Sequence, residues 1–543
     1  MKMMHDMKLN RTTLAAALLT ASIALPGAPG LAAEISKDTL VIVSEMGPNG
    51  LDTMVPTAND HSRMVVWQAY DRLVSHGEKN LADGTVSYDA KVVTPELAES
   101  WEASDDGKTY IFHLRKDATF HDGTPVTAKD VKWSFDRAIA AGGFPAVQMA
   151  AGSLVKPEQF SVVDDHTFKA TFDQFNKLTM PDLVVPVPVI INSELAKKHA
   201  TAQDPWAFEW VSRNDCGGGA FKVESWTSGQ QTVFTRFDDW KSGPLPKLKR
   251  VVYRQIASAG TRRALLEKGD VDMSVGLPPK DYAELAEQGK VKVIGVPVQN
   301  DLVFVDMNVK IPPFDNPKVR EAVSYAIPYK EIISSALYNR AKPMFGGDPS
   351  QPYPAATWPV PIKHGQDLDK AKKLLTEAGF PDGFKTTLSI DLSEATVREP
   401  SAILIQEALK TIGVEVTIEK VPGSNWFAQM ASKTMPMVIA EFYGWLDYPD
   451  YFFFWTYDGA NNSVFDTANY VNPDLDKVID VARFTRDPEV YKTSLNKMVD
   501  IVMTDLPRIP LYTRFADYAV QKNVQGFEYW FHTHPDFRKL YKE

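Results

Sequence analysis

The spacing of apolar and polar residues predicts strands at several places in the chain. Tyr110, Phe112 and Leu114 fall at every second position, which is the period of a strand with one buried face. Residues 168–172 (FKATF) repeat that alternation. Residues 39–43 (TLVIV) form an apolar run that ends at the turn sequence GPNG, as expected of a strand.

Helices are predicted where apolar residues recur every three or four positions behind a residue that caps a helix N-terminus. Four starts have this form: Thr127 with Asp130, Asn316-Pro317, Asp367 and Asn472-Pro473. Gly379 follows the third segment and is a typical helix-ending residue. Because the predicted helices alternate with the predicted strands, the pattern indicates an α/β fold.

Length and charge narrow the class of protein. At 543 residues the chain is well above the roughly 50–200 residues of one domain, so several domains are expected. Hydrophobic residues make up 44% and charged residues 24%, which is typical of soluble globular proteins. The formal net charge of −10 argues against a nucleic-acid partner, because such a partner requires a basic surface.

The N-terminus has the pattern of a signal peptide. Three cations precede an apolar stretch, residues 12–25, that is shorter than the roughly 20 residues needed to span a bilayer. The sequence GLA places small residues before a cut after Ala32, so a signal peptide over 1–32 is predicted. No later run holds 18 uncharged apolar residues, and we expect a soluble periplasmic protein.

Motifs for catalysis are missing from the sequence. It contains no GxSxG, GxxxxGK[ST] or HExxH, so we expect neither an enzyme nor a cofactor. Cys216, the only cysteine, precedes Gly217–Gly219, where a thiol nucleophile is conceivable. A small buried residue beside a tight turn is the favoured interpretation, because no catalytic histidine is identifiable.

Segment 93–137 contains four blocks in a fixed order: PELAESW from Pro95, DGKTYIFHLR ending at Arg115, FHDG from Phe120 and TAKDVKWSF from Thr127. This order resembles the signature of the bacterial extracellular solute-binding proteins of family 5, which serve peptide-, dipeptide-, oligopeptide- and nickel-type ABC importers. The later segments GGGAFKV and AKKLLTEAGFPDGF also resemble blocks of that family.

The resemblance implies an α/β fold of two lobes (a type II, cluster C periplasmic binding protein) with an extra subdomain on the first lobe. It assigns the first lobe to residues 33–73, 190–300 and 506–543, the subdomain to 74–189 and the second lobe to 301–505. The implied function is capture of a peptide-type ligand between the lobes and its delivery to an inner-membrane permease with separate ATPase subunits. A monomer is expected.

The resemblance also indicates a ligand site within residues 441–457 (EFYGWLDYPDYFFFWTY). In the family's peptide binders an aspartate of this block pairs with the ligand's α-amine, and the matching residue is Asp447. A buried ammonium needs such a carboxylate, because an uncompensated charge is costly. Tyr443 and Trp445 would offer backbone groups on one side of a strand to an extended peptide, and Tyr448 belongs to the same block.

Other interpretations of the ligand stay open at this stage. The aromatic run 451–455 (YFFFW) is either core or a pocket wall for a ring-bearing ligand. Trp426 and Met46 are further predicted ligand contacts. The alternatives to a peptide are an opine or amino-acid conjugate, an oligosaccharide and a nickel complex.

His532 and His534 form an HxH pair that would share one face of a strand. Such a pair is a possible metal site, but no third ligand is visible in the sequence. A secreted metalloprotein or enzyme that uses these histidines is the alternative from a different class, and no metal site is predicted.

Overall fold

The computed structural model describes residues 36–543 except residue 56 and the segments 298–300 and 344–363. The predicted signal peptide lies outside the described residues. Strands and helices alternate along the chain, which confirms the predicted α/β class. None of the helices in the described ranges is long and apolar enough to cross a membrane.

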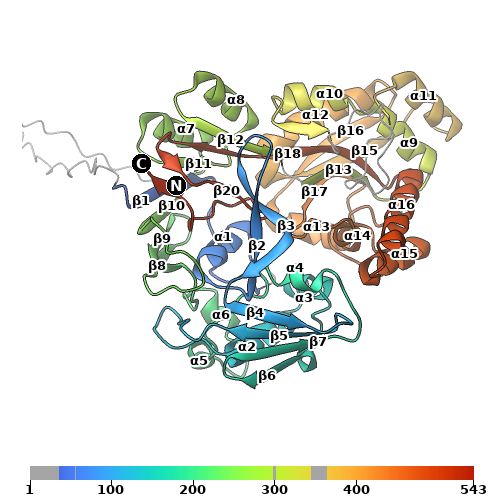
Figure 1. The fold of residues 1–543 in the computed structure, drawn as a ribbon. Coiled ribbons are helices and arrows are strands. Elements are labelled where there is room, and N and C mark those ends of the chain that lie inside the picture. The colour runs from blue at the N-terminus through green and yellow to red at the C-terminus, as the bar shows by residue number, and fades with distance from the viewer. Residues whose placement is uncertain (1–35, 56, 298–300, 344–363) are drawn as a thin grey trace, which may run out of the picture. The chain divides into compact units, whose positions relative to one another are not determined.

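A large mixed sheet runs through the molecule (Figure 1). In order of pairing its strands are β16 (Glu415–Val421), β15 (Lys385–Asp391), β17 (Met437–Tyr443), β13 (Asp301–Met307), β18 (Arg508–Val520), β11 (Met273–Val275), β1 (Thr39–Ser44), β10 (Arg250–Gln255), β9 (Gln231–Arg236) and β8 (Phe221–Thr227). Two more strands, β12 (Lys292–Pro297) and β14 (Ala341–Pro343), pair with β18.

Strand β18 connects the two halves of this sheet. Its residues 508–514 pair with β13 and β14, and its residues 515–520 pair with β11 and β12. The change of partner between Arg514 and Phe515 places the middle of β18 where the two halves meet. The boundaries of the predicted lobes themselves stay a prediction.

Helices lie along both halves of the sheet. The half that contains β1 carries α1 (Asp60–Ala69), α7 (Ala259–Lys268) and α8 (Pro279–Gln288). The half that contains β17 carries α9 (Pro317–Ala326), α10 (Tyr329–Glu331), the π-helical turn η2 (Ile332–Ala336), α11 (Leu368–Glu377), the 3₁₀ turn η3 (Leu392–Glu394), α12 (Ala395–Lys410), α13 (Gly423–Ser432), α14 (Pro449–Thr456), α15 (Pro473–Phe484) and α16 (Pro488–Asp505).

Three smaller sheets complete the fold. A four-stranded sheet has the order β4 (Ala98–Ala103), β5 (Thr109–Leu114), β7 (Thr167–Thr171) and β6 (Phe160–Asp164), and α2 (Ala128–Ala140) packs against β6 and β7. The same part of the chain also forms α3 (Gly143–Ala151), η1 (Pro157–Gln159), α4 (Thr179–Asp182), α5 (Ser193–Lys197) and α6 (Phe208–Val211). Strands β2 (Val74–Asn80) and β3 (Val86–Pro95) pair with β20 (Glu528–Tyr529), and β19 (Val524–Gln525) pairs with β21 (Tyr541–Lys542).

The predicted helix starts are confirmed. Thr127 and Asp130 form a capping box at the start of α2. Side chains of Asn316, Asp367 and Asn472 accept hydrogen bonds from the first turns of α9, α11 and α15, which satisfies otherwise unpaired N–H groups. Gly379 has a φ of +91° just after α11, a conformation that glycine adopts without steric cost.

Candidate ligand-binding site

A cavity of about 240 Å³ lies where β18 changes its pairing partners. That volume is just below the usual range of about 300–1,000 Å³ for small-molecule sites. The lining comes from eight separate places along the chain. They are 44–46 at the end of β1, 60–61 in α1, Tyr253, residues between 275 and 282 around the start of α8, Leu337 with Arg340, residues between 393 and 397 at the start of α12, 514–518 in β18, and 533–535 near the C-terminus.

Arg514 carries the strongest charge cluster of the cavity wall. Its Nε lies 2.7 Å from Glu441 Oε1 and 3.2 Å from Asp301 Oδ2, and its guanidinium lies 3.6 Å from Glu394. Arg398 donates to the other oxygen of Glu441 at 2.5 Å. Arg514 and Glu394 of the lining therefore belong to a cluster of three carboxyl groups and two guanidinium groups that continues behind the cavity wall.

The pKa values of two carboxyl groups in this cluster are shifted in opposite directions. Burial and the neighbouring Glu441 raise the pKa of Asp301 well above its ordinary value. Burial opposes ionisation of Glu441 as well, but the charges of Arg514 and Arg398 outweigh it and lower the pKa of Glu441. Burial acts on both carboxyl groups in the same sense, so the two guanidinium charges around Glu441 account for the opposite directions of the two pKa shifts.

Asp60 anchors the opposite wall. Asn59 caps α1 and accepts from Ser62 N at 3.0 Å, which places Asp60 in the first helical turn. Asp60 Oδ2 lies 2.8 Å from His534 Nε2, and its Oδ1 accepts from Arg63 at 3.0 Å. Burial raises its pKa, but His534 and Arg63 reverse that effect and hold the pKa well below the ordinary value. Asp60 therefore has close polar partners at both of its carboxylate oxygens.

Two further pairs complete the polar lining. His61 Nδ1 lies 3.1 Å from the Tyr253 hydroxyl, and burial lowers the pKa of His61 to about 4, so its ring is neutral at pH 7. Arg340 pairs with Asp517, whose Oδ2 accepts from Arg340 Nε at 3.1 Å. Burial raises the pKa of Asp517 to about 6 despite that partner.

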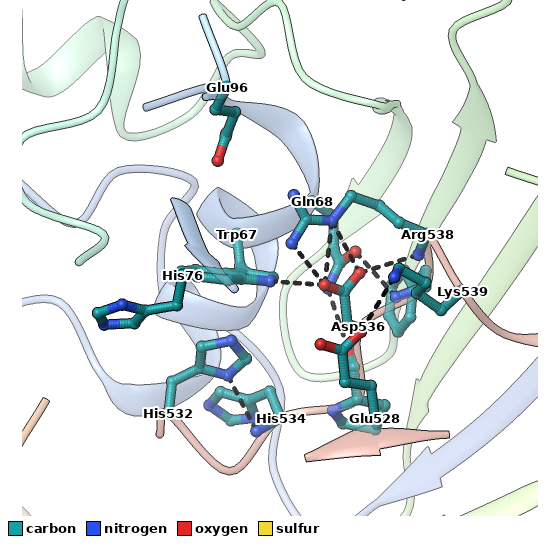
Figure 2. Close-up of polar contacts among 12 residues, drawn as sticks. Trp67, Gln68, His76, Glu96, Glu528, His532, His534, Asp536, Arg538 and Lys539 are labelled. Atoms are coloured by element: carbon teal, nitrogen blue, oxygen red, sulfur yellow. Dashed lines mark hydrogen bonds and ion pairs between the residues drawn. The ribbon is translucent and has the colours of Figure 1, made fainter. Parts of the chain in front are cut away.

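The C-terminal segment is held in place by hydrogen bonds and ion pairs of buried side chains (Figure 2). Trp67 Nε1 donates to Asp536 Oδ2 at 3.2 Å, and Arg538 donates to the same carboxylate. His534 N donates to His532 Nδ1 at 3.1 Å. These bonds fix the turn that presents His534 to Asp60.

The family of the chain follows from a comparison with known families. Residues 92–464 match the model of the bacterial extracellular solute-binding proteins, family 5. The chain belongs to this family. Members of the family bind solutes for ABC importers and are carriers rather than catalysts, and no catalytic family is indicated.

Relatives of this solute-binding protein cover nearly its full length. It is 29% identical to the probable D,D-dipeptide-binding periplasmic protein DdpA of Escherichia coli K12, over 95% of both chains. It is 28% identical to the glutathione-binding protein GsiB of Salmonella choleraesuis, over 88% of this chain and 91% of that one. The structure of AgaA from A. tumefaciens R10 in complex with agropinic acid superposes with a TM-score of 0.77 at 28% identity, over 93% and 99% of the two chains. The fold is that of a two-lobe periplasmic binding protein.

Two of the predicted site residues lie at or beside the cavity of this solute-binding protein. Met46 lines the cavity and is 39% exposed. The Tyr443 hydroxyl donates to Asp60 Oδ1 at 2.7 Å, so Tyr443 contacts a lining residue. Tyr443 is also the last residue of β17 and pairs with Asp301 of β13.

Asp447 is not among the residues that line the cavity. Burial raises its pKa, and the nearby Lys79 and Lys91 of the β2–β3 hairpin lower it in part. The charges that act on this carboxylate therefore come from β2 and β3. The predicted role of Asp447 in binding an amine stays a prediction.

Trp445 does not continue the strand, contrary to the prediction that it shares a strand side with Tyr443. Strand β17 ends at Tyr443, and Trp445 packs edge-on against Phe144 with ring centroids 5.2 Å apart. Arg63 lies over its ring at 5.0 Å. Gly444, with the Tyr451 ring 2.8 Å from where a Cβ would stand, turns the chain here because only glycine fits so close to that ring.

The remaining predicted contacts pack inside the protein. Trp426 lies in α13 and is buried against Met430, Val438 and their neighbours. Tyr448 is the N-cap residue of α14 and packs against the main core. Residues 451–455 form the middle of α14 and are all buried, so the aromatic run is core.

The histidine pair and the cysteine have structural roles in the described residues. His532 and His534 lie in a turn rather than a strand, because Thr533 between them has a φ of +58°. Within the described ranges, no group of three or more metal-ligating side chains exists. Cys216 is buried, and burial raises the pKa of its thiol well above the ordinary value, which suits the predicted small buried residue.

Sequence reasoning missed Arg514, Glu394, Arg340 and Asp60. They come from four segments that are distant in sequence, so no local spacing joins them. One signal was present: Arg514 and Asp517 interrupt the otherwise apolar strand sequence IPLYTRFADYAV. A charge inside such a strand requires a partner or a ligand, since a lone buried charge is costly.

Proposed function

We propose that this protein is the periplasmic substrate-binding component of an ABC importer for a small peptide or a similar amine-bearing ligand. After removal of its signal peptide it captures the ligand as a monomer and delivers it to a membrane permease with separate ATPase subunits. The full-length similarity to a dipeptide-binding and a glutathione-binding relative supports this ligand class. No nucleic acid takes part.

The observation that carries the proposal is the mixed charge of the cavity. Arg340 and Arg514 face it together with Glu45 and Glu394, so both ends of a zwitterion find opposite charge. Buried charges need such compensation. The volume of about 240 Å³ suits a ligand of dipeptide size better than a long peptide.

An opine or amino-acid conjugate is the second candidate. It rests on AgaA, which is 28% identical and was solved with agropinic acid. Such a ligand is also small and carries both charges. An oligosaccharide loses its main support, because the aromatic run that would stack on sugar rings is core in α14.

Native mass spectrometry of the protein purified from its own periplasm tests the proposal. We expect a bound mass in the range of a dipeptide or tripeptide, released on denaturation and identified by fragmentation. A single opine would move the ligand to the second candidate. A sugar or a metal chelate as the released compound would contradict the proposed ligand class.

A further inference from the structure

Lys177 carries a positive charge from the predicted subdomain 74–189 to three helices of the predicted second lobe. Its Nζ donates to the Ala482 carbonyl in the last turn of α15 and lies 3.5 Å from Asp450 Oδ2 in the first turn of α14. The same ammonium lies 3.8 Å from the ring centroid of Tyr491 in α16. One side chain of the subdomain therefore binds groups from α14, α15 and α16 at once.

The groups around this ammonium form a socket, which consists of the Ala482 carbonyl, the Asp450 carboxylate and the Tyr491 ring. The carboxylate is 0% exposed, and the Tyr491 hydroxyl donates to its other oxygen at 2.7 Å. Burial raises the pKa of Asp450, and the charge of Lys177 lowers it in part. The end of a helix and the face of an aromatic ring both attract cations, so the socket suits an ammonium group.

The subdomain holds Lys177 in position through both of its neighbours in the chain. Asn176 is 1% exposed, and its side-chain amide donates to the Ala151 carbonyl at 2.8 Å and to Ser153 Oγ at 2.9 Å. Leu178 is fully buried, and its N–H donates to Asn176 Oδ1 at 2.9 Å. Because the backbone on either side is fixed, the lysine loses less conformational freedom when it enters the socket.

A second cation crosses the same interface in the opposite direction. Arg483 of α15 donates to the carbonyls of Ala150 and Ala151 at the end of α3, each at 3.2 Å. Beside it the Tyr451 hydroxyl of α14 donates to Gln148 Oε1 of α3 at 2.8 Å. These contacts are made through side chains, so they can separate without breaking the pairing of any strand.

We propose that Lys177 is a positioning residue for ligand capture: it fastens the subdomain to α14, α15 and α16 when the lobes close, and it leaves the socket when they open. The inference rests on the proposed function, because such a latch acts only in a protein that closes around a ligand. The free energy of the contact then belongs to the closed state alone, so it strengthens ligand binding and does not stabilise the open form. None of the described residues that line the cavity comes from 74–189, and the latch gives this subdomain a part in binding.

Amine labelling of the full mature protein, freed of ligand, tests the latch without knowledge of the ligand. In this structure the side chain of Lys177 is 17% exposed, whereas that of Lys477 in α15 is 76% exposed and serves as the reference. A short pulse of acetic anhydride, read out by peptide mass spectrometry, should modify Lys177 no more than about fivefold more slowly than Lys477, because the open form leaves the socket empty. Stronger protection of Lys177 would overturn the inference, since the contact would then exist without ligand.

Substitution of Lys177 separates a latch from a permanent structural contact. Isothermal titration calorimetry with L-alanyl-L-alanine, D-alanyl-D-alanine and glutathione measures affinity, and urea unfolding of the ligand-free protein measures stability. Lys177→Met should weaken binding of the preferred probe at least about tenfold and leave the urea midpoint unchanged, because the closed state alone loses the contact. Lys177→Arg keeps the charge and should stay within about threefold of wild type. Lys156→Met is the matched control, since it removes an exposed ion pair with Asp173 of the same subdomain and should change neither quantity.

The opposite pattern would overturn the inference. A lower urea midpoint of ligand-free Lys177→Met with unchanged affinity would make Lys177 a permanent structural contact. Failure of Lys177→Met to fold would contradict the latch as well, because an open form that already lacks the contact folds without it. If wild type binds none of the three probes, the proposed ligand class fails, whereas the labelling of Lys177 in the ligand-free protein still decides whether the latch opens.

Discussion

At the scale of single residues, Glu528 is a carboxyl group placed where ionisation is costly. It is 2% exposed, and neither of its oxygens accepts a hydrogen bond in the described structure. The nearest cation, Lys539, lies 3.7 Å away and also binds Glu78 (Figure 2). Burial and the negative charge of Asp536 raise the pKa of Glu528 to about 7.

This pKa predicts a stability that falls as pH rises. Between pH 4.5 and 7 the folded protein keeps the Glu528 proton that the unfolded chain releases, so folding is favoured at the acidic end of that window. Glu528→Gln should remove this dependence and raise the free energy of unfolding at pH 8 by about 2–3 kcal/mol. Urea unfolding of wild type and variant at pH 5 and pH 8 measures the free energy of unfolding at both ends of this range. A variant as pH-dependent as wild type would show that Glu528 is ionised in the fold.

Single residues also show the limit of prediction for the site. Met46 was within reach of sequence reasoning because it directly follows a recognisable strand. Glu394 was not, because it lies directly after β15 and its neighbour Arg514 lies on β18, 120 positions later in the chain. The two come together only through the pairing of β15 with β17, β17 with β13 and β13 with β18. Charge clusters assembled by sheet pairing leave no spacing pattern in the sequence.

At the scale of elements, α14 is a core helix with an unusual composition. Tyr451, Phe452, Phe453, Phe454 and Trp455 are all buried within it. The rings surround the helix on several faces: Phe452 lies edge-on to Phe442, and Phe453 stacks on Tyr457 with centroids 5.0 Å apart. A helix that is apolar all round is buried on all sides.

Truncation within α14 should therefore cost stability. Phe453→Ala leaves a cavity and should lower the free energy of unfolding by about 3–5 kcal/mol. The control is Phe427→Ala in α13, where the side chain is 60% exposed and the expected change is within about 0.5 kcal/mol. Urea unfolding monitored by circular dichroism gives both values. A small effect of Phe453→Ala combined with lost ligand binding would instead make the aromatic run part of the site.

Elements were the most predictable part of the fold. Capping residues such as Asn316 and Asp367 bond to N–H groups within the first helical turn. A few neighbouring residues of the sequence are therefore enough to predict where such a helix begins. The HxH pair shows the opposite case, since the two histidines would share one face only on a strand and the structure has a turn there. That turn is imposed by distant groups, above all Trp67, which binds Asp536.

At the scale of the whole molecule, contacts join elements that the predicted lobes keep apart. The Tyr443 hydroxyl of β17 donates to Asp60 of α1 at 2.7 Å, and Arg63 lies over the Trp445 ring. Lys177, next to α4, lies 3.5 Å from Asp450 of α14. If the lobes open without ligand, as in hinge-closing binding proteins, these contacts exist only in the closed state.

Weakening such a contact should therefore shift the population toward the open state. Tyr443→Phe removes a hydrogen bond to a charged acceptor and should destabilise the closed state by about 1–2 kcal/mol, which weakens ligand binding roughly 5- to 30-fold. Small-angle X-ray scattering at a fixed, subsaturating ligand concentration should give a larger radius of gyration for the variant than for wild type.

Saturating ligand should restore the compact value, because the ligand pulls the remaining open molecules closed. Lys129→Ala is the control, since it removes an exposed ion pair with Asp165 and should change neither affinity nor radius. Weaker binding by Tyr443→Phe with an unchanged radius at every ligand concentration would mean that Tyr443 touches the ligand itself. In that case the contact with Asp60 would belong to the binding site, and closure would depend on other contacts, of which Lys177 with Asp450 is the next to test.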